Sequence, residues 1–121
     1  MPAIARSVNL VIPSAEAIID GKGMHIICEG YATALSVRRV MKSLGLKYTI
    51  HVAFSASNIL EVARGHDPFV VSDNDLAGLR SAKKVGKYWV SDVEGEDFND
   101  AEKRLGTKVL ASYFGKVIQE L

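Results

Sequence analysis

The chain has 121 residues, which is enough for one domain and too few for two. Hydrophobic residues make up 48% of it and charged residues 24%, a balance that is typical of a globular chain and excludes a wholly disordered one. Its 15 basic and 14 acidic residues give a net charge of +1, so the overall charge does not attract it to nucleic acid. Any nucleic-acid contact must come from a local basic patch or from a metal ion.

Two further features exclude other classes of protein. Cys28 is the only cysteine, which excludes an intramolecular disulfide and a zinc site that requires several thiolates; we expect it to fill a buried strand. No apolar run approaches the roughly 20 residues of a membrane-spanning helix, and polar residues interrupt the amino-terminal segment, which is a poor signal peptide. We therefore expect a cytoplasmic protein with a single domain over residues 1–121.

Short apolar runs alternate with amphipathic segments along the chain. Residues 25–28 form a β-branched apolar run between two glycines, which predicts a buried strand. In residues 31–44 apolar side chains recur at helical spacing and Gly45 follows, which predicts a helix that ends there. The same reasoning predicts, in chain order, a strand at 48–54, a helix at 58–64, a strand at 69–72, a helix at 76–85, a strand at 87–91, a helix at 99–105 and a last amphipathic helix at 107–121.

Strands that alternate with helices of this length are typical of βαβ units. The sequence therefore predicts an α/β, Rossmann-like fold with a central, mainly parallel four-stranded sheet flanked by helices. Residues 8–12 and 17–19 are candidates for an added edge strand or hairpin. We expect the apolar stripe of the last helix to pack on the chain's own sheet; the alternative is docking onto a further domain or a second copy.

Acidic residues follow three of the predicted strands. They are Glu29 after the first strand, Asp73 and Asp75 after the third, and Asp97 and Asp100 after the fourth. The carboxyl ends of parallel strands share the edge of the sheet at which ligands bind, so we expect these carboxylates to gather there. Clustered carboxylates repel one another unless a cation lies among them, and hard oxygen ligands select Mg²⁺ or Mn²⁺ over zinc.

An alternative interpretation of the same acids is structural. Paired acids are common in turns, and an aspartate that follows a strand often caps the next helix. That interpretation suits Asp73 and Asp75 taken alone. It suits Glu29 less well, because a helix cap at that place is normally Ser, Asp or Asn and because Gly30 follows at once.

Three segments carry a resemblance to a known family. ICEGYATALSV (27–37) resembles the Glu-Gly motif of the Toprim domain, the catalytic fold of topoisomerases, bacterial-type primases and some nucleases, and VVSDNDLAGLRSA (70–82) resembles its D-x-D-x-x-G motif. GEDFND (95–100) is similar to the acidic loop of primase-type members. The resemblance covers about residues 18–106 and is strongest to phage and plasmid primases and primase–helicases, in which E-G-Y-A-T-A and D-N-D-x-A-G occur together.

The resemblance implies a role for each matching residue. The acids that match are Glu29 as general acid/base or metal ligand, Asp73 and Asp75 as the pair that binds Mg²⁺ (or Mn²⁺), and Asp97 as a further metal-site acid. Gly30 and Gly78 match the glycines that keep the backbone close to metal and phosphate. No tyrosine stands at an obvious nucleophile position, so we do not expect topoisomerisation by this chain alone.

Basic residues near these motifs are candidates for phosphate contacts. They are Lys22, which precedes the first strand, and Arg80, Lys83 and Lys84, which follow D-x-D-x-x-G. The alternative for each is a solvated position on a helix face, and the same alternative applies to the basic face of the helix at 31–44.

The activity that the resemblance implies is Mg²⁺-dependent nucleotidyl transfer, the synthesis of RNA primers from nucleoside triphosphates on single-stranded DNA. The zinc module and basic amino-terminal subdomain of cellular primases have no counterpart in the sequence, and no P-loop for a helicase motor is present. We therefore expect further primase or helicase domains or subunits as partners, and weak activity of the isolated domain. Alternatives are a Toprim nuclease and a non-catalytic module that binds nucleic acid or protein.

The three histidines and the aromatic pair Tyr88 and Trp89 have structural interpretations. His25, His51 and His66 lack the spacing of a metal-ligand motif, so we expect structural roles for them. Tyr88 and Trp89 are neighbours in a predicted strand and must face opposite sides of it. One of the two belongs to the core, and the other is a candidate for stacking on a base.

Overall fold

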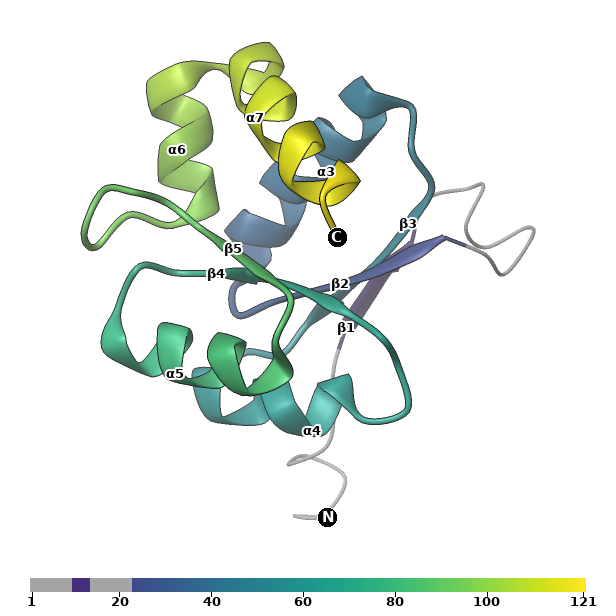
Figure 1. The fold of residues 1–121 in the computed structure, drawn as a ribbon, viewed down its shortest axis with the longest axis vertical. Coiled ribbons are helices and arrows are strands. Elements are labelled where there is room, and N and C mark those ends of the chain that lie inside the picture. The colour runs from purple at the N-terminus through teal and green to yellow at the C-terminus, as the bar shows by residue number, and fades with distance from the viewer. Residues whose placement is uncertain (1–9, 14–22) are drawn as a thin grey trace.

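The computed structural model describes residues 10–13 and 23–121, and at its centre is a five-stranded sheet with the order β1-β3-β2-β4-β5 (Figure 1). The strands are β1 (Leu10–Pro13), β2 (Met24–Cys28), β3 (Tyr48–Val52), β4 (Phe69–Ser72) and β5 (Tyr88–Val90). Strands β2 to β5 are parallel, and β1 pairs antiparallel with β3. The predicted α/β fold with a four-stranded parallel sheet is confirmed, and β1 is an edge strand that overlaps the segment predicted at 8–12.

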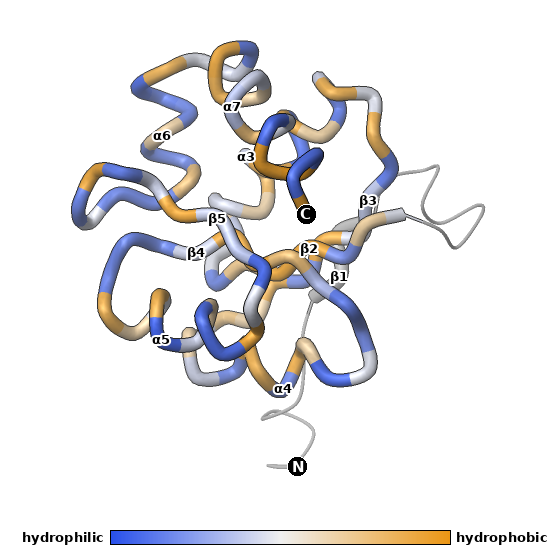
Figure 2. The backbone as a smooth tube through the Cα atoms, viewed as in Figure 1, coloured by the Kyte–Doolittle hydropathy of each residue, from blue (hydrophilic) through white to orange (hydrophobic). Residues whose placement is uncertain are grey.

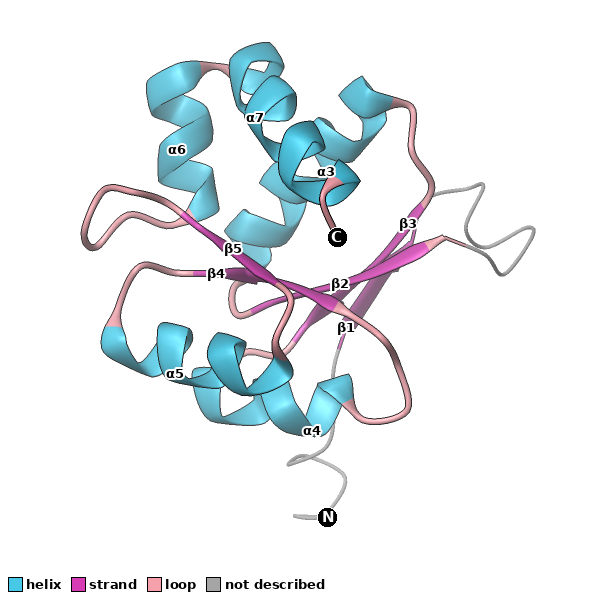
Figure 3. Ribbon diagram, in the orientation of Figure 1, coloured by secondary structure: helices cyan, strands magenta, loops and turns pink. Residues whose placement is uncertain are grey.

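Helices cover both faces of the sheet (Figure 3). The first face carries α3 (Tyr31–Leu44), α6 (Phe98–Leu105) and α7 (Thr107–Gln119). The second face carries the short 3₁₀ turn η1 (Ala56–Asn58), α4 (Ile59–Ala63) and α5 (Leu76–Val85). No helix in the described part of the chain combines the length and the hydropathy needed to cross a bilayer.

The last three residues of β2 and all four of β4 are buried, and helices on both faces of the sheet explain the largely apolar sequences of these segments (Figure 2). Successive side chains of a strand point to opposite faces, so Ile26 and Cys28 pack under α3, α6 and α7, whereas Ile27 packs under α4 and α5. Both isoleucines are fully buried, and each such side chain stabilises the fold by about 1.5–3 kcal/mol. Burial raises the pKa of the Cys28 thiol to about 12, in keeping with its predicted role as a filler.

Several elements differ from their predicted bounds by one or two residues, and two of these differences have a local reason. The strand predicted at 48–54 ends at Val52, because Phe54 has a φ of 66°, a left-handed conformation that no extended strand contains. The helix predicted at 58–64 is preceded by η1, because the Ser55 hydroxyl accepts a hydrogen bond of 3.2 Å from the Asn58 N–H and starts the turn early. The hairpin candidate at 17–19 lies outside the described residues.

The last helix packs on the chain's own sheet, as predicted. Leu110 and Phe114 are buried, and the Phe114 ring meets Phe69 of β4 edge to face with their centroids 5.6 Å apart. The apolar stripe is narrower than the sequence indicates, since Tyr113 and Leu121 are 55% and 54% exposed.

Strand β5 separates its two aromatic residues as predicted. Trp89 packs against the larger core, with its ring centroid 4.9 Å from that of Phe98, and Tyr88 packs against the smaller core on the other face. Both side chains are used in packing, which leaves the predicted base-stacking role without support from either.

Candidate functional site

Glu29 and Asp73 meet at one edge of the sheet because of the strand register. Strands β2 and β4 are adjacent and parallel, with Cys28 opposite Val71, so the residues that follow the two strands emerge together. The carbonyl oxygen of Glu29 accepts a hydrogen bond of 2.8 Å from the Phe54 N–H, which extends the β2–β3 pairing beyond the strand ends and fixes the Glu29 backbone. Both acids are half-buried.

The charge environment of Asp73 indicates that the predicted acids lie near one another. The pKa of Asp73 is raised to about 6, first by burial and then by the negative charges of Glu29, Asp97, Asp75 and Asp100. Every charged residue that contributes to this shift is acidic. We call these five carboxylates the acidic rim.

Asn74, the middle residue of the D-N-D sequence, connects the loop after β5 to the end of β4 through hydrogen bonds. Its side-chain amide donates a hydrogen bond of 2.8 Å to the carbonyl of Ser91, and its backbone N–H donates one of 3.1 Å to the carbonyl of Glu96. Its own carbonyl accepts a third hydrogen bond, of 2.9 Å, from the Gly95 N–H. These contacts bring Asp97 to the rim, so Asn74 is a positioning residue that the motif alone did not reveal.

Glu96 holds the same loop from within and is not part of the rim. Its carboxylate accepts hydrogen bonds from the Arg104 guanidinium at 2.9 Å and from the Ser91 hydroxyl. The bond from Arg104, and then that from Ser91, lowers the pKa of Glu96. Within the predicted acidic segment 95–100, Glu96 is therefore a structural acid.

Two of the rim acids also cap helices, as the structural interpretation expected. Asp75 caps α5, and its Oδ1 atom accepts a hydrogen bond of 2.7 Å from the Gly78 N–H. Asp97 caps α6 in a reciprocal pair: its Oδ1 accepts from the Asp100 N–H at 2.7 Å, and its own N–H donates to the Asp100 carboxylate at 3.2 Å. Because each cap uses one oxygen of two, capping and cation binding are compatible.

Gly78 and Gly30 differ in the space that their surroundings leave for a side chain. A Cβ atom on Gly78 would lie 2.9 Å from the carbonyl oxygen of Asp73, closer than real Cβ atoms come, and 3.0 Å from the Ser72 hydroxyl, a tight contact. Packing within the turn therefore requires Gly78. A Cβ atom on Gly30 would meet nothing within 4 Å, and its φ of −110° suits any residue, so the implied role of Gly30 toward phosphate stays a prediction.

The donor chemistry of the acidic rim fits a hard dication. Five carboxylates supply oxygen ligands, and a cation would offset the repulsion that adds to burial in raising the pKa of Asp73. Among the described residues, however, the three potential ligands that already lie close enough to share one ion are histidines. Magnesium usually keeps several water ligands, so the rim acids can bind it partly through water or after a small closure.

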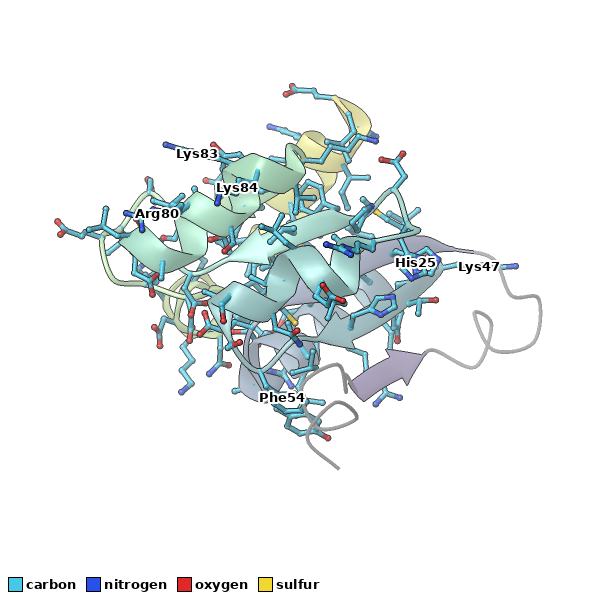
Figure 4. The ribbon with its side chains drawn as sticks, turned by 90° about the horizontal axis from the view of Figure 1, so that it is seen from below. His25, Lys47, Phe54, Arg80, Lys83 and Lys84 are labelled. Atoms are coloured by element: carbon cyan, nitrogen blue, oxygen red, sulfur yellow. The ribbon has the colours of Figure 1, made fainter. Side chains whose placement is uncertain are left out.

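Of the described basic residues predicted to contact phosphate, Arg80 lies nearest to Asp75 along α5. Arg80, Lys83 and Lys84 are exposed and project from α5 (Figure 4). Lys83 and Lys84 belong to the last turn of that helix, which places them about 12 Å along its axis from Asp75. Lys22 lies outside the described residues.

The basic face of α3 has a structural partner. Arg39 donates hydrogen bonds to the Glu102 carboxylate of α6, the shortest of them 2.6 Å, and this bond is the main reason why the pKa of Glu102 is lowered. Glu102 also accepts hydrogen bonds from Ser36 and Thr107, both at 2.9 Å. Arg39 therefore joins α3 to α6 and is not available to a ligand in this arrangement.

Exposed apolar side chains flank the rim, a feature that the sequence did not indicate. Tyr31 starts α3 two residues after Glu29 and is 51% exposed, and Leu76 starts α5 and is 80% exposed. Phe54 follows β3 and is 57% exposed, with the left-handed backbone described above. Large apolar groups beside a polar site are suited to contact the flat faces of bases.

The three histidines come together, contrary to what their spacing in the sequence suggested. His25 and His51 lie on neighbouring strands, with 2.9 Å between His25 Nδ1 and His51 Nε2. His66 lies in the turn between α4 and β4, and its ring stacks on that of His25 with centroids 4.3 Å apart. The strand register and this turn gather three histidines that their spacing in the sequence did not bring together, and the expected structural roles stay a prediction.

Comparisons with protein-family models, with curated proteins and with solved structures each found no match to this chain. The site itself offers two kinds of chemistry. The acidic rim provides hard oxygen ligands and a carboxylate, Glu29, on the strand end next to Asp73. The histidine group provides nitrogen ligands on the face of the sheet that α4 and α5 cover.

Proposed function

We propose that the chain is the Toprim-type catalytic domain of a primase, which joins nucleotides on single-stranded DNA with the help of Mg²⁺ or Mn²⁺. The observation that carries the proposal is the acidic rim, in which burial first, and then the charges of four neighbouring carboxylates, raise the pKa of Asp73 to about 6. Such repulsion costs stability and is typical of a site that a cation completes. The order of the Glu-Gly and D-x-D-x-x-G motifs, at the carboxyl ends of adjacent parallel strands, supports the same family.

The proposed mechanism divides the work among the rim residues. Asp73 and Asp75 would hold the metal ion, with Asp97 as a further ligand through the oxygen that its helix cap leaves free. When bound, the ion neutralises charge on the triphosphate and on the leaving pyrophosphate. Glu29 takes the proton of the 3′-hydroxyl. The hydroxyl oxygen then attacks the α-phosphorus of the incoming nucleotide, and the bond from that phosphorus to pyrophosphate breaks.

Neighbouring side chains would bind the rest of the substrates. Phe54 and Tyr31 offer exposed rings for stacking on a base, a contact worth about 1–3 kcal/mol. Arg80 would contact phosphate near the rim, whereas Lys83 and Lys84 would contact the backbone of a longer strand. Template binding with so few groups is weak, which favours further primase or helicase domains or subunits as partners.

A non-catalytic binding module is the second candidate, and the helix caps favour it. Asp75, Asp97 and Asp100 all have capping hydrogen bonds that would explain their presence without a metal ion. The caps explain neither Glu29 nor the crowding of charge on Asp73, which is why we place catalysis first.

The test is incubation of the full chain with Mg²⁺ or Mn²⁺, the four ribonucleoside triphosphates and labelled single-stranded DNA. We expect short RNA products from the wild type, none from Glu29→Gln or Asp73→Asn, and wild-type amounts from Glu94→Gln and Asp92→Asn. Glu94 and Asp92 are exposed acids in the loop after β5 and do not belong to the rim, so they match the two test substitutions in chemistry.

Each alternative has its own outcome in this experiment. Cleavage of the DNA without primer synthesis would assign the same rim to a nuclease. Metal-independent DNA binding that survives Asp73→Asn combined with Asp75→Asn, without any product, would replace catalysis by the binding module. Calorimetry of Mg²⁺ with and without nucleotide, on wild type and on that double variant, shows whether the rim binds metal at all.

A further inference from the structure

All three histidines of the sequence lie in one group on the α4/α5 face of the sheet. His25 belongs to β2 and His51 to β3, with His51 opposite Ile27 in the parallel register. Both point to the same face as Ile27, because each is one position out of step with the residues that face α3. His66 reaches them from the turn before β4, after Gly65, whose φ of 80° redirects the chain.

The distances within the group approach those of ligands around a common point. One nitrogen from each ring can be chosen so that all three lie within 4.8 Å of one another. Nitrogens bound to one tetrahedral zinc ion, at bonds of about 2.0–2.1 Å, are about 3.3–3.5 Å apart. The 2.9 Å between His25 and His51 is shorter than this and the 4.8 Å limit of the group is longer, so the rings must turn to bring one nitrogen each to a common ion.

We propose that His25, His51 and His66 bind one transition-metal dication, zinc foremost, through one nitrogen each and with a fourth coordination position open. Neutral imidazole is the ligand form and is favoured by borderline ions such as Zn²⁺ and Co²⁺ rather than by Mg²⁺. The bound ion fastens the turn before β4 to the two central strands β2 and β3.

The surroundings of His51 and His25 disfavour the charged forms of these two rings. Burial first, and then the neighbouring histidines, lowers the pKa of His51 to about 4, and burial followed by His66 lowers that of His25. His66 is exposed, which gives an ion a path to the site from solvent.

The histidine site is separate from the acidic rim. His25 and Glu29 are four residues apart on one extended strand, a separation of about 13 Å. Nitrogen ligands at one place and oxygen ligands at the other allow the chain to hold two different metal ions. The proposal does not depend on the proposed function, because it uses none of the rim residues.

The test is titration of the metal-free full chain, without a polyhistidine tag, with Co²⁺ and then Zn²⁺. We expect ligand-field absorption bands that saturate at one Co²⁺ per chain and disappear when Zn²⁺ displaces the cobalt. His66→Ala should lower the affinity at least tenfold, since changes even outside the ligand shell cost 10–100-fold. Because His66 lies in an exposed turn, this variant should keep the fold.

Two matched variants make the result decisive. Arg64→Ala changes an exposed side chain of the same turn and should bind cobalt as the wild type does. Asp73→Asn combined with Asp75→Asn should also bind it normally. Absence of saturable cobalt or zinc binding, binding unchanged by His66→Ala, or binding lost in the rim variant would each overturn the proposal.

Discussion

The Oδ1 atom of Asp75 accepts a hydrogen bond of 2.7 Å from the backbone N–H of Gly78, so a carboxylate of the acidic rim also closes the first turn of α5. The two roles of this side chain need different chemistry. A cap needs only an acceptor oxygen, which asparagine supplies as well as aspartate does, whereas cation binding needs the charge. Substitutions can therefore separate the two roles.

We expect Asp75→Asn and Asp75→Ala to differ in stability but not in metal binding. In the metal-free protein, Asn should leave the free energy of unfolding unchanged or slightly raised, and Ala should lower it by about 1 kcal/mol through loss of the cap. Both should weaken Mg²⁺ binding in the presence of nucleotide. Urea denaturation with chelator and calorimetry measure the two effects, and an Asn variant that binds Mg²⁺ as the wild type does would reduce Asp75 to a cap.

The raised pKa of Asp73 predicts how stability depends on pH. Its pKa in the folded state, about 6, is above the ordinary value of 3.8, so the folded protein holds this proton more tightly than the unfolded chain does. Ionisation of Asp73 therefore destabilises the fold progressively as pH rises from about 4 to about 6. Asp73→Asn should abolish this contribution and make the metal-free protein more stable than the wild type above pH 6.

The measurement is the difference in melting temperature between Asp73→Asn and wild type from pH 3.5 to 7.5, with chelator. The difference cancels the opposite contributions of Glu96 and Glu102, whose pKa values are lowered and whose stabilisation is lost toward acid pH. Asp92→Asn, an exposed acid outside the rim, should give a flat difference. A flat difference for Asp73→Asn as well would contradict the crowding of charge on which the proposed metal site depends.

The sequence reveals where strands end but not the register in which they pair. It could therefore place Glu29 and Asp73 at one edge of the sheet, but it could not bring the histidines together. Glu29 and Asp73 each follow an apolar strand directly, so any parallel pairing of those strands brings them to one edge. His25 and His51 are 26 residues apart and meet only through the particular register of β2 on β3. No local spacing encodes that register, and none encodes the left-handed Phe54 that ends β3 early.

A second limit of sequence reasoning concerns the glycines of the two motifs. Gly78 leaves no room for a Cβ atom beside Asp73, whereas Gly30 has open space around it. We expect Gly78→Ala to destabilise the protein by about 1–3 kcal/mol, because the turn must move to admit the methyl group. Gly30→Ala should change stability by less than about 1 kcal/mol.

Thermal or urea denaturation of the two variants provides the comparison. A Gly30→Ala variant that is stable but has lost nucleotide binding would support the close approach of phosphate that the resemblance implies. Equal stability of the two variants would show that the turn after β4 adapts easily, against the tight packing seen at Gly78.

Arg39 and Arg80 lie on different helices. We expect substitution of Arg39 to lower stability without changing DNA binding, and substitution of Arg80 to weaken DNA binding without changing stability. Arg39 joins α3 to α6 through Glu102, a buried carboxylate that would lose its charged partner in Arg39→Ala. This variant should be less stable by about 1–3 kcal/mol and should bind single-stranded DNA as the wild type does. Arg80→Ala should keep the stability and weaken DNA binding, with a smaller dependence of affinity on salt, because one phosphate contact is lost.

The two arginine variants test where nucleic acid meets the protein. Denaturation gives the stability, and fluorescence anisotropy with labelled single-stranded DNA at several salt concentrations gives the affinity. Lys108→Ala, an exposed cation on α7, is the matched control and should change neither quantity. DNA binding that Arg39→Ala weakens while Arg80→Ala leaves it intact would move the binding surface from α5 to the α3/α6 side of the sheet, away from the basic residues on which the proposed substrate path depends.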